Sequence, residues 1–170
     1  MRLQPYVPKT APSIRKRFRI IFRKMNPNLV YLVQTDTTVG FLSQNKKALA
    51  KAKKRDPKQP FLIATNSFAK QKQFVRTPVK FKKSVRRARR TTFLYPNRKA
   101  VRVVCEKNHR SFLQRFGFMY SSSANASKHP FVLSYAVKTA DIIVEDASGF
   151  HDGAASSIYR LGKRTKKRLR

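Results

Sequence analysis

Short runs of apolar and β-branched residues recur along the chain, and each run predicts a buried strand. The clearest is Leu29–Gln34, and a second apolar run covers Pro60–Thr65. Later runs with the same character predict further strands at Thr91–Tyr95, Ala100–Cys105, Phe118–Ser121, Asp141–Val144 and Ser156–Leu161.

Two segments between these runs carry helix signals instead. Asn45 can cap a helix that continues to about Lys54, with small and apolar side chains on one face, and Asp56-Pro57 ends it. Residues 108–116 predict a second helix, which Gly117 terminates. Strands interleaved with helices indicate an α/β or α+β domain built on a twisted sheet.

The net charge of the chain indicates the kind of partner that it binds, and it carries no information about the fold. The 170 residues suit one domain, and 40 Lys and Arg against 7 Asp and Glu leave a net charge of +33. Such an excess predicts a polyanionic partner: RNA, DNA or an anionic membrane surface. We expect a basic N-terminal extension at 1–24, a compact domain at 25–162, and a basic, frayed C-terminal tail at 163–170.

The remaining composition excludes several classes of site. The one cysteine, Cys105, permits no internal disulfide, which fits a reducing, cytoplasmic environment, and we expect it to be a small buried thiol. The three histidines (His109, His129 and His151) match no zinc spacing. No run is long enough to span a membrane, so no stable membrane association is expected.

Three polar segments carry the candidate chemistry. Thr35-Asp36-Thr37 follows a predicted strand, and Asp36 could hold a cationic amine, orient Lys53 or Arg55, or position a metal. Lys53 and Arg55 follow at a predicted helix end, where they could bind phosphate oxygens. Ser122–Ser127 supplies hydroxyl and amide groups for an anion or a metal-bound water. Each segment taken alone also fits an ordinary solvated turn or surface.

The order of these segments resembles the YrdC-type threonylcarbamoyl-adenylate synthase family. The matching pieces are Gln34–Phe41, Lys53-Lys54-Arg55, Pro60–Ile63, Thr92-Phe93-Leu94, Val101-Arg102-Val103, Ser122–Ser127, Ala140–Ile143 and Ser156-Ser157-Ile158. The chain departs from the family pattern at Gln34, Val39, Asp56, Ala88-Arg89-Arg90 and Lys128.

The resemblance implies a single α/β domain: a twisted, mixed, open sheet flanked by helices, with a basic concave cavity. It implies synthesis of threonylcarbamoyl-AMP from L-threonine, bicarbonate and ATP with Mg²⁺, for transfer to tRNA by partner proteins. Thr35 would then contact threonine, and Arg102 an anionic group. The residues expected at ATP and its phosphates are Lys53, Arg55, Gln59, Thr92, Ser123, Asn125 and Ser127.

A non-enzymatic RNA-binding protein on the same fold is the main alternative. Basic runs occur at the N-terminus, at Val79–Arg90 and at Arg160–Arg170, and aromatic residues such as Phe81 and Phe93 lie within or near the central run. Lysine and arginine neutralise phosphates, and aromatic rings can stack on unpaired bases. A membrane-surface role for residues 1–24 is a more distant alternative.

Overall fold

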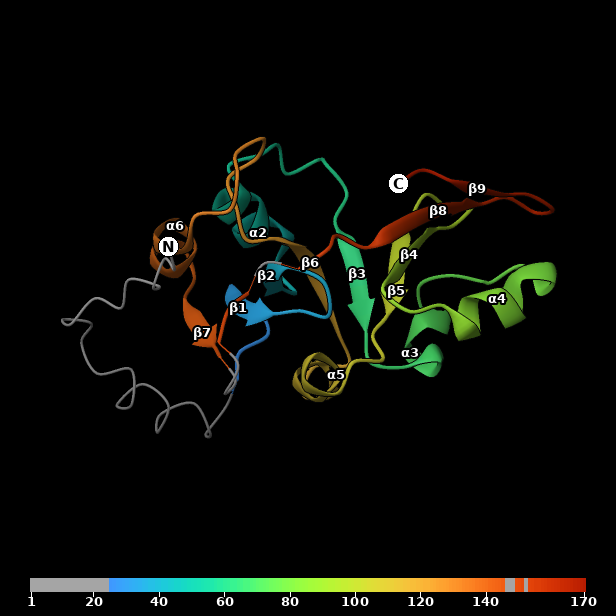
Figure 1. Cartoon of the computed structure of the whole chain (residues 1–170), viewed down its shortest axis with the longest axis horizontal. Helices are drawn as coiled ribbons and strands as arrows, with labels where there is room; N and C mark the ends of the chain where they lie inside the picture. Colours follow the sequence, from blue (N-terminus) through green and yellow to red (C-terminus); the bar gives the residue numbers. More distant parts are fainter. Residues whose placement is uncertain (1–24, 146–148, 152) are drawn as a thin grey trace, which may run out of the picture.

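The computed structural model describes residues 25–145, 149–151 and 153–170. These residues form one nine-stranded sheet in the order β7-β1-β2-β6-β3-β5-β4-β8-β9, flanked by helices (Figure 1). The strands are β1 (Tyr31–Gln34), β2 (Val39–Ser43), β3 (Leu62–Thr65), β4 (Thr91–Leu94), β5 (Ala100–Val103), β6 (Phe118–Ser123), β7 (Ile142–Val144), β8 (Ser157–Leu161) and β9 (Lys166–Arg168). The helical elements are α2 (Lys46–Lys53), α3 (Phe68–Lys72), the 3₁₀ turn η1 (Val79–Phe81), α4 (Lys82–Arg87), α5 (Lys107–Gln114) and α6 (Leu133–Thr139).

Parallel and antiparallel pairs are mixed in this sheet. The pairs β1–β7, β3–β5 and β4–β8 are parallel, and the other neighbouring strands are antiparallel. The predicted fold class, a single α/β domain with a mixed, twisted, open sheet, is therefore confirmed. The expected basic extension at residues 1–24 lies outside the described residues.

Alternation along the strands gives the sheet two distinct faces. On one face, Leu32, Phe41 and Phe61 pack with Leu49 of α2 and Ala136 of α6. The same face continues over β5, β4 and β8, where a second group of apolar residues packs with η1 and α4. On the other face, Tyr31, Leu42 and Met119 pack against Phe112 and Leu113 of α5, and a cavity lies beside that packing.

Several predicted boundaries hold because local chemistry determines them. Asn45 accepts from the backbone N–H groups of Lys47 and Ala48, so α2 begins where the capping signal placed it. Gly117 has φ +78° after α5, and its N–H donates to the Leu113 carbonyl oxygen at 2.7 Å. Lys128 also has a positive φ, of 65°, at the position where the family pattern carries glycine.

Other elements were missed. Residues 35–43 look like a turn because of their threonines and Gly40, yet β2 begins at Val39 and pairs with both β1 and β6. The helices α3, α4 and α6 were not predicted, because their sequences are short and their apolar positions sparse. Ser121–Ser123 belong to β6, so the serine-rich turn begins only at Ala124.

Two further expectations are wrong. Residues 166–168 form β9, paired with β8, rather than a frayed tail, because the edge of β8 offers unsatisfied backbone groups. Cys105 is exposed rather than buried, because β5 ends two residues before it. Among the described residues, no helix has the length and apolar character needed to cross a membrane.

Candidate functional site

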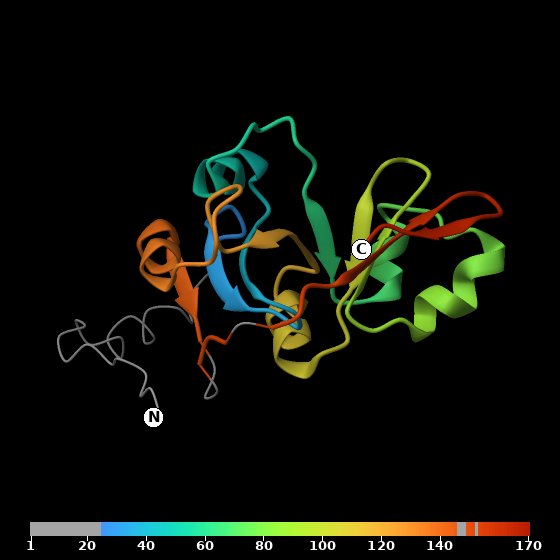
Figure 2. The ribbon, with the colours of Figure 1, turned by 45° about the horizontal axis from the view of Figure 1, so that its top comes forward.

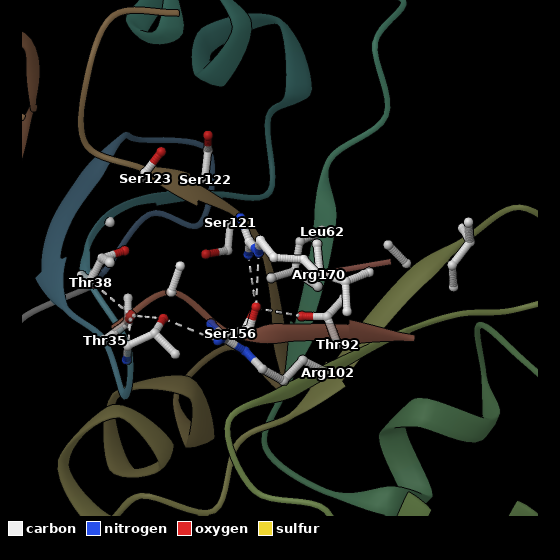
Figure 3. A pocket seen from close by; sticks show the side chains of 16 residues that line it. Thr35, Thr38, Leu62, Thr92, Arg102, Ser121, Ser122, Ser123, Ser156 and Arg170 are labelled. Atoms are coloured by element: carbon white, nitrogen blue, oxygen red, sulfur yellow. Dashed lines mark hydrogen bonds between the residues drawn. The ribbon is translucent and has the colours of Figure 1, made fainter. Parts of the chain in front are cut away.

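The cavity has a volume of about 370 Å³ and lies on the α5 face of the sheet (Figure 3). Its floor comes from β6, β3, β5, β4 and β8, and its wall from the loop between β1 and β2. The lining residues are mostly small and hydroxylic: Thr35, Thr37, Thr38, Gly40, Leu62, Thr92, Leu94, Ala100, Arg102, Ser121, Ser122, Ser123, Ala155, Ser156, Ile158 and Arg170. A cavity of this size suits a small molecule.

Arg102 supplies a buried positive charge to the floor. Its side chain is only 3% exposed, and its guanidinium lies 3.3 Å from Oδ1 of Asp36. Another of its nitrogens donates to the Thr37 hydroxyl at 3.1 Å, whereas Nε has no partner among the described residues. Burial lowers the pKa of Arg102, but an arginine remains charged at neutral pH. The carboxylate of Asp36 therefore compensates a charge that lies against the cavity.

His109 of α5 also contacts Asp36, at the same carboxylate oxygen as Arg102. Its Nδ1 lies 3.3 Å from both the backbone nitrogen and Oδ1 of Asp36, so either neutral tautomer can bond to this residue. Burial lowers the pKa of His109 more than the neighbouring carboxylate raises it, so the neutral ring predominates at pH 7. For Asp36 itself, burial would raise the pKa, but the hydrogen bond from His109 and the charge of Arg102 outweigh it and hold the pKa low.

One of the roles predicted for Asp36, the orientation of Lys53 or Arg55, is wrong. Its contacts are with Arg102 and His109 rather than with Lys53 or Arg55. Sequence reasoning missed His109 because 73 residues separate it from Asp36, and a single histidine on a helix carries no recognisable spacing. The only available signal was that Asp36 is one of seven acidic residues in a strongly basic chain.

Thr35 lies in the cavity wall and shapes the loop that carries Asp36. Its hydroxyl donates to the Thr38 carbonyl oxygen at 2.6 Å and accepts from the Thr37 backbone N–H at 3.2 Å. Gly40 allows this loop to approach β6, because a Cβ there would lie 2.9 Å from Thr35 Cγ2 and 3.1 Å from the Ser122 carbonyl oxygen.

Lys53 joins α2 to the end of β6. Its ammonium group donates to Ser123 Oγ at 3.0 Å and to both oxygens of Asn125, at 2.8 and 2.7 Å. The backbone continues the link, because the Ser127 N–H donates to the Lys53 carbonyl oxygen. Burial, with a smaller contribution from the charge of Arg55, lowers the pKa of Lys53 to about 8. Ser123 lines the cavity, so Lys53 and Asn125 lie directly behind its wall.

The remaining predicted residues divide between the cavity and its surroundings. Thr92 lines the cavity, but Arg55, Gln59, Asn125 and Ser127 do not. The Arg55 guanidinium stacks 3.8 Å from the centre of the Phe61 ring and donates to the Pro60 carbonyl oxygen. Its Nε is buried without a partner among the described residues, and Gln59 is exposed.

Arg170 was not predicted, yet it lines the cavity. Its Nε donates to the Ser156 carbonyl oxygen at 3.0 Å, and a terminal nitrogen reaches Ser156 Oγ at 3.4 Å. The hydroxyl of Ser156 in turn lies 3.2 Å from that of Thr92. β9 returns the chain to this position, and a tail assumed to be frayed gave no reason to expect a site residue there.

The arrangement suits the binding of anions. Two guanidinium groups and several hydroxyls face the cavity, and none of the described residues that line it is acidic. No cluster of His, Cys, Asp or Glu suited to a metal ion is found in the described ranges.

Comparison with known proteins identifies the family of this chain and proteins with a similar fold. The family model for Sua5, YciO and YrdC proteins, described as telomere recombination, matches residues 25–170. P. abyssi Sua5 superposes with a TM-score of 0.71 at 18% identity, over 84% of this chain and 49% of that one. A structure of P. abyssi Sua5 complexed with L-threonine gives a TM-score of 0.69 at 16% identity, over 84% of this chain and 50% of that one.

E. coli YciO superposes with a TM-score of 0.65 at 17% identity, over 94% of this chain and 90% of that one. The present chain therefore spans about half the length of P. abyssi Sua5 and most of the length of YciO. At these identities the structural likeness establishes the fold alone. No curated protein sequence matches the chain.

Proposed function

Because the chain belongs to the Sua5/YciO/YrdC family, we propose that it is an L-threonylcarbamoyladenylate synthase. The reaction joins L-threonine, bicarbonate and ATP into threonylcarbamoyl-AMP, and releases pyrophosphate and one water. Partner proteins would pass the threonylcarbamoyl group to an adenosine of certain tRNAs. We place this activity in the cytoplasm, where ATP and tRNA are both present.

One observation carries the proposal: three distant segments bring complementary groups to one cavity. Thr35 comes from the β1–β2 loop, Arg102 from β5 and Ser123 from the end of β6, where Lys53 binds it. The L-threonine complex of P. abyssi Sua5 supports an amino-acid substrate for this fold. Bicarbonate, a carbamate and the triphosphate are all anions, so positioning and charge stabilisation would supply the catalysis without a protein nucleophile.

Arg102 is the residue best placed to bind a carboxylate or bicarbonate. Its contact with Asp36 and Thr37 fixes the guanidinium, so little conformational freedom is lost when an anion binds. Arg170 would add a second guanidinium near Ser156 and Thr92, and Thr35 would contact the threonine.

Lys53 and the serine-rich segment would bind the ATP phosphates. All three ammonium hydrogens of Lys53 already have neutral acceptors, so it would exchange one of these oxygens for a phosphate oxygen. Charge-assisted hydrogen bonds are stronger than those to neutral acceptors, which favours that exchange. Arg55, Gln59, Asn125 and Ser127 would take part from the cavity's surroundings, and Mg²⁺ would arrive bound to ATP.

The test is pyrophosphate release by the pure protein with ATP and Mg²⁺. We expect release only when L-threonine and bicarbonate are both present. Ser123→Ala and Arg102→Met should each abolish it, whereas Ser134→Ala, which changes an exposed serine on α6, should leave it unaltered. Circular dichroism of each variant establishes that it is folded. A folded wild-type protein that releases no pyrophosphate under these conditions would refute the proposal.

A further inference from the structure

The end of the molecule farthest from α6 carries a projection built from two elements. α4 and the β8–β9 hairpin lie side by side there and extend from the body of the domain (Figures 1 and 2). Lys166 of β9 donates to Ser84 Oγ of α4 at 2.9 Å, and Lys80 of η1 reaches the Arg164 carbonyl oxygen at 3.5 Å. We call residues 80–90 and 160–168 together the basic ridge.

Nearly every exposed position on the ridge is cationic. Phe81 and Val85, one helical turn apart, face the core, which leaves the other positions of α4 to solvent. The exposed cations of this helix and of the hairpin are Lys82, Lys83, Arg86, Arg87, Arg160, Lys163, Arg164, Lys166, Lys167 and Arg168. The sequence has no acidic residue between 57 and 105 or between 153 and 170, and no ion pair in the described ranges involves the ridge.

The hairpin presents charge on both of its faces. Lys166 lies on the face that packs toward α4, where its ammonium group sits 4.3 Å from the centre of the Tyr159 ring. Arg160 and Lys167, which pair with each other across the hairpin, belong to the opposite face. Arg160 also pairs with Leu94, which lines the cavity. The ridge is therefore continuous with the cavity side of the sheet.

We propose that the basic ridge binds the phosphate backbone of a folded nucleic acid, with structured RNA as its occupant. Lysine and arginine at this density repel one another unless polyanionic charge neutralises them. One face of the hairpin packs on α4, so the ridge has exposed cations of α4 on one side and Arg160 and Lys167 on the other. Phosphates on the two sides of a groove can contact both sides of such a ridge, whereas a flat anionic membrane would neutralise one side only.

This surface is separate from the proposed reaction site. None of the α4 cations lines the cavity, and RNA binding by the ridge requires neither ATP nor threonine. RNA binding by the ridge can therefore be tested independently of the proposed synthase activity.

The test compares two variants that lose the same charge. One changes the four α4 cations (K82Q/K83Q/R86Q/R87Q), and the matched control changes four exposed lysines of α2 and its C-terminal end (K46Q/K47Q/K51Q/K54Q). Binding of a fluorescent RNA hairpin to the full chain is measured by anisotropy over a range of salt concentrations, without nucleotide. A DNA duplex of the same length and anionic phospholipid vesicles serve as the other probes.

We expect the α4 variant to bind the RNA hairpin at least tenfold more weakly at physiological salt. The slope of log K against log salt should fall by about 3, because each lost phosphate contact removes roughly 0.7 to 0.9 from it. The control should bind within about twofold of the wild type. Equal losses in the two variants would show diffuse attraction by net charge and overturn the proposal. So would binding to vesicles without binding to RNA, or to DNA alone.

Discussion

Asp36→Asn is the sharpest probe of how the cavity is built. The substitution keeps the size of the side chain but removes the negative charge that compensates Arg102. Both side chains are buried, at 4% and 3% exposure, and their closest atoms are 3.3 Å apart. With an effective dielectric constant of about 20, charges at this distance attract by roughly 5 kcal/mol.

The expected loss in the free energy of unfolding is smaller than that attraction but still large. Removing one partner of a buried ion pair costs roughly 3–5 kcal/mol, because the remaining charge stays buried without compensation. The Thr37 hydroxyl and the new amide oxygen can still accept from Arg102, so we expect the free energy of unfolding to fall by about 3 kcal/mol. Urea denaturation at pH 7 measures it, and the m-value should not change.

Two further variants test whether the loss of stability comes from the uncompensated charge of Arg102. Asp141→Asn makes the same change at an exposed carboxylate, which accepts from the Val30 N–H at 2.8 Å, and should cost less than about 1 kcal/mol. The double variant Asp36→Asn with Arg102→Met removes both buried charges and should recover most of the stability. A loss below about 1 kcal/mol for Asp36→Asn, or a double variant no more stable than the single one, would contradict the argument.

The difference in free energy of unfolding between wild type and Asp36→Asn should depend on pH in one direction. The folded protein holds the pKa of Asp36 below its ordinary value, so the carboxylate stabilises the fold above the unfolded pKa of about 3.9. That contribution disappears as the pH falls through the lowered, folded-state pKa. The gap in stability between wild type and Asp36→Asn should therefore narrow in acid.

Three other predictions concern single residues. His109 is neutral when folded, so wild-type stability should decrease as the pH falls below about 6.5, whereas His109→Gln should lose this component in urea denaturation. Burial lowers the pKa of Lys53 to about 8, so stability should rise between that pH and the ordinary lysine value of 10.5, and Lys53→Met should remove the rise. Lys128 is exposed with φ 65°, so Lys128→Gly should raise the free energy of unfolding by about 1 kcal/mol, and a lower urea midpoint would contradict this.

Elements with strong local signals were predictable from the sequence. Asn45 as a cap and Gly117 as a terminator placed two helices correctly, and buried runs such as Leu62–Thr65 placed most of the strands. α6 and β9 were missed because they depend on distant partners. Leu133 and Val137 of α6 are exposed, so its apolar positions do not define one buried face. β9 is a run of cations, and its strand conformation depends on pairing with β8.

The candidate site was also predicted only in part, because some of its residues belong to local motifs and others reach it only through tertiary packing. Thr35, Thr92, Arg102 and Ser123 were expected at the site and line the cavity, whereas Lys53, Arg55, Gln59, Asn125 and Ser127 lie outside its lining. His109 and Arg170 were missed. Both reach the site through elements whose positions depend on packing, α5 and β9, and neither belongs to a local pattern.

The sequence by itself determined the family, the order of the strands and helices with local signals, and the excess of positive charge. These properties reside in neighbouring residues or in simple counts. Only the tertiary structure decided which groups each buried charge contacts. Asp36 pairs with the charge of Arg102 and contacts the ring of His109, and Lys53 donates to neutral oxygens of the serine-rich segment. Burial makes these pairings necessary, because a charge removed from water must find a partner, and that partner is set by proximity in space rather than in the chain.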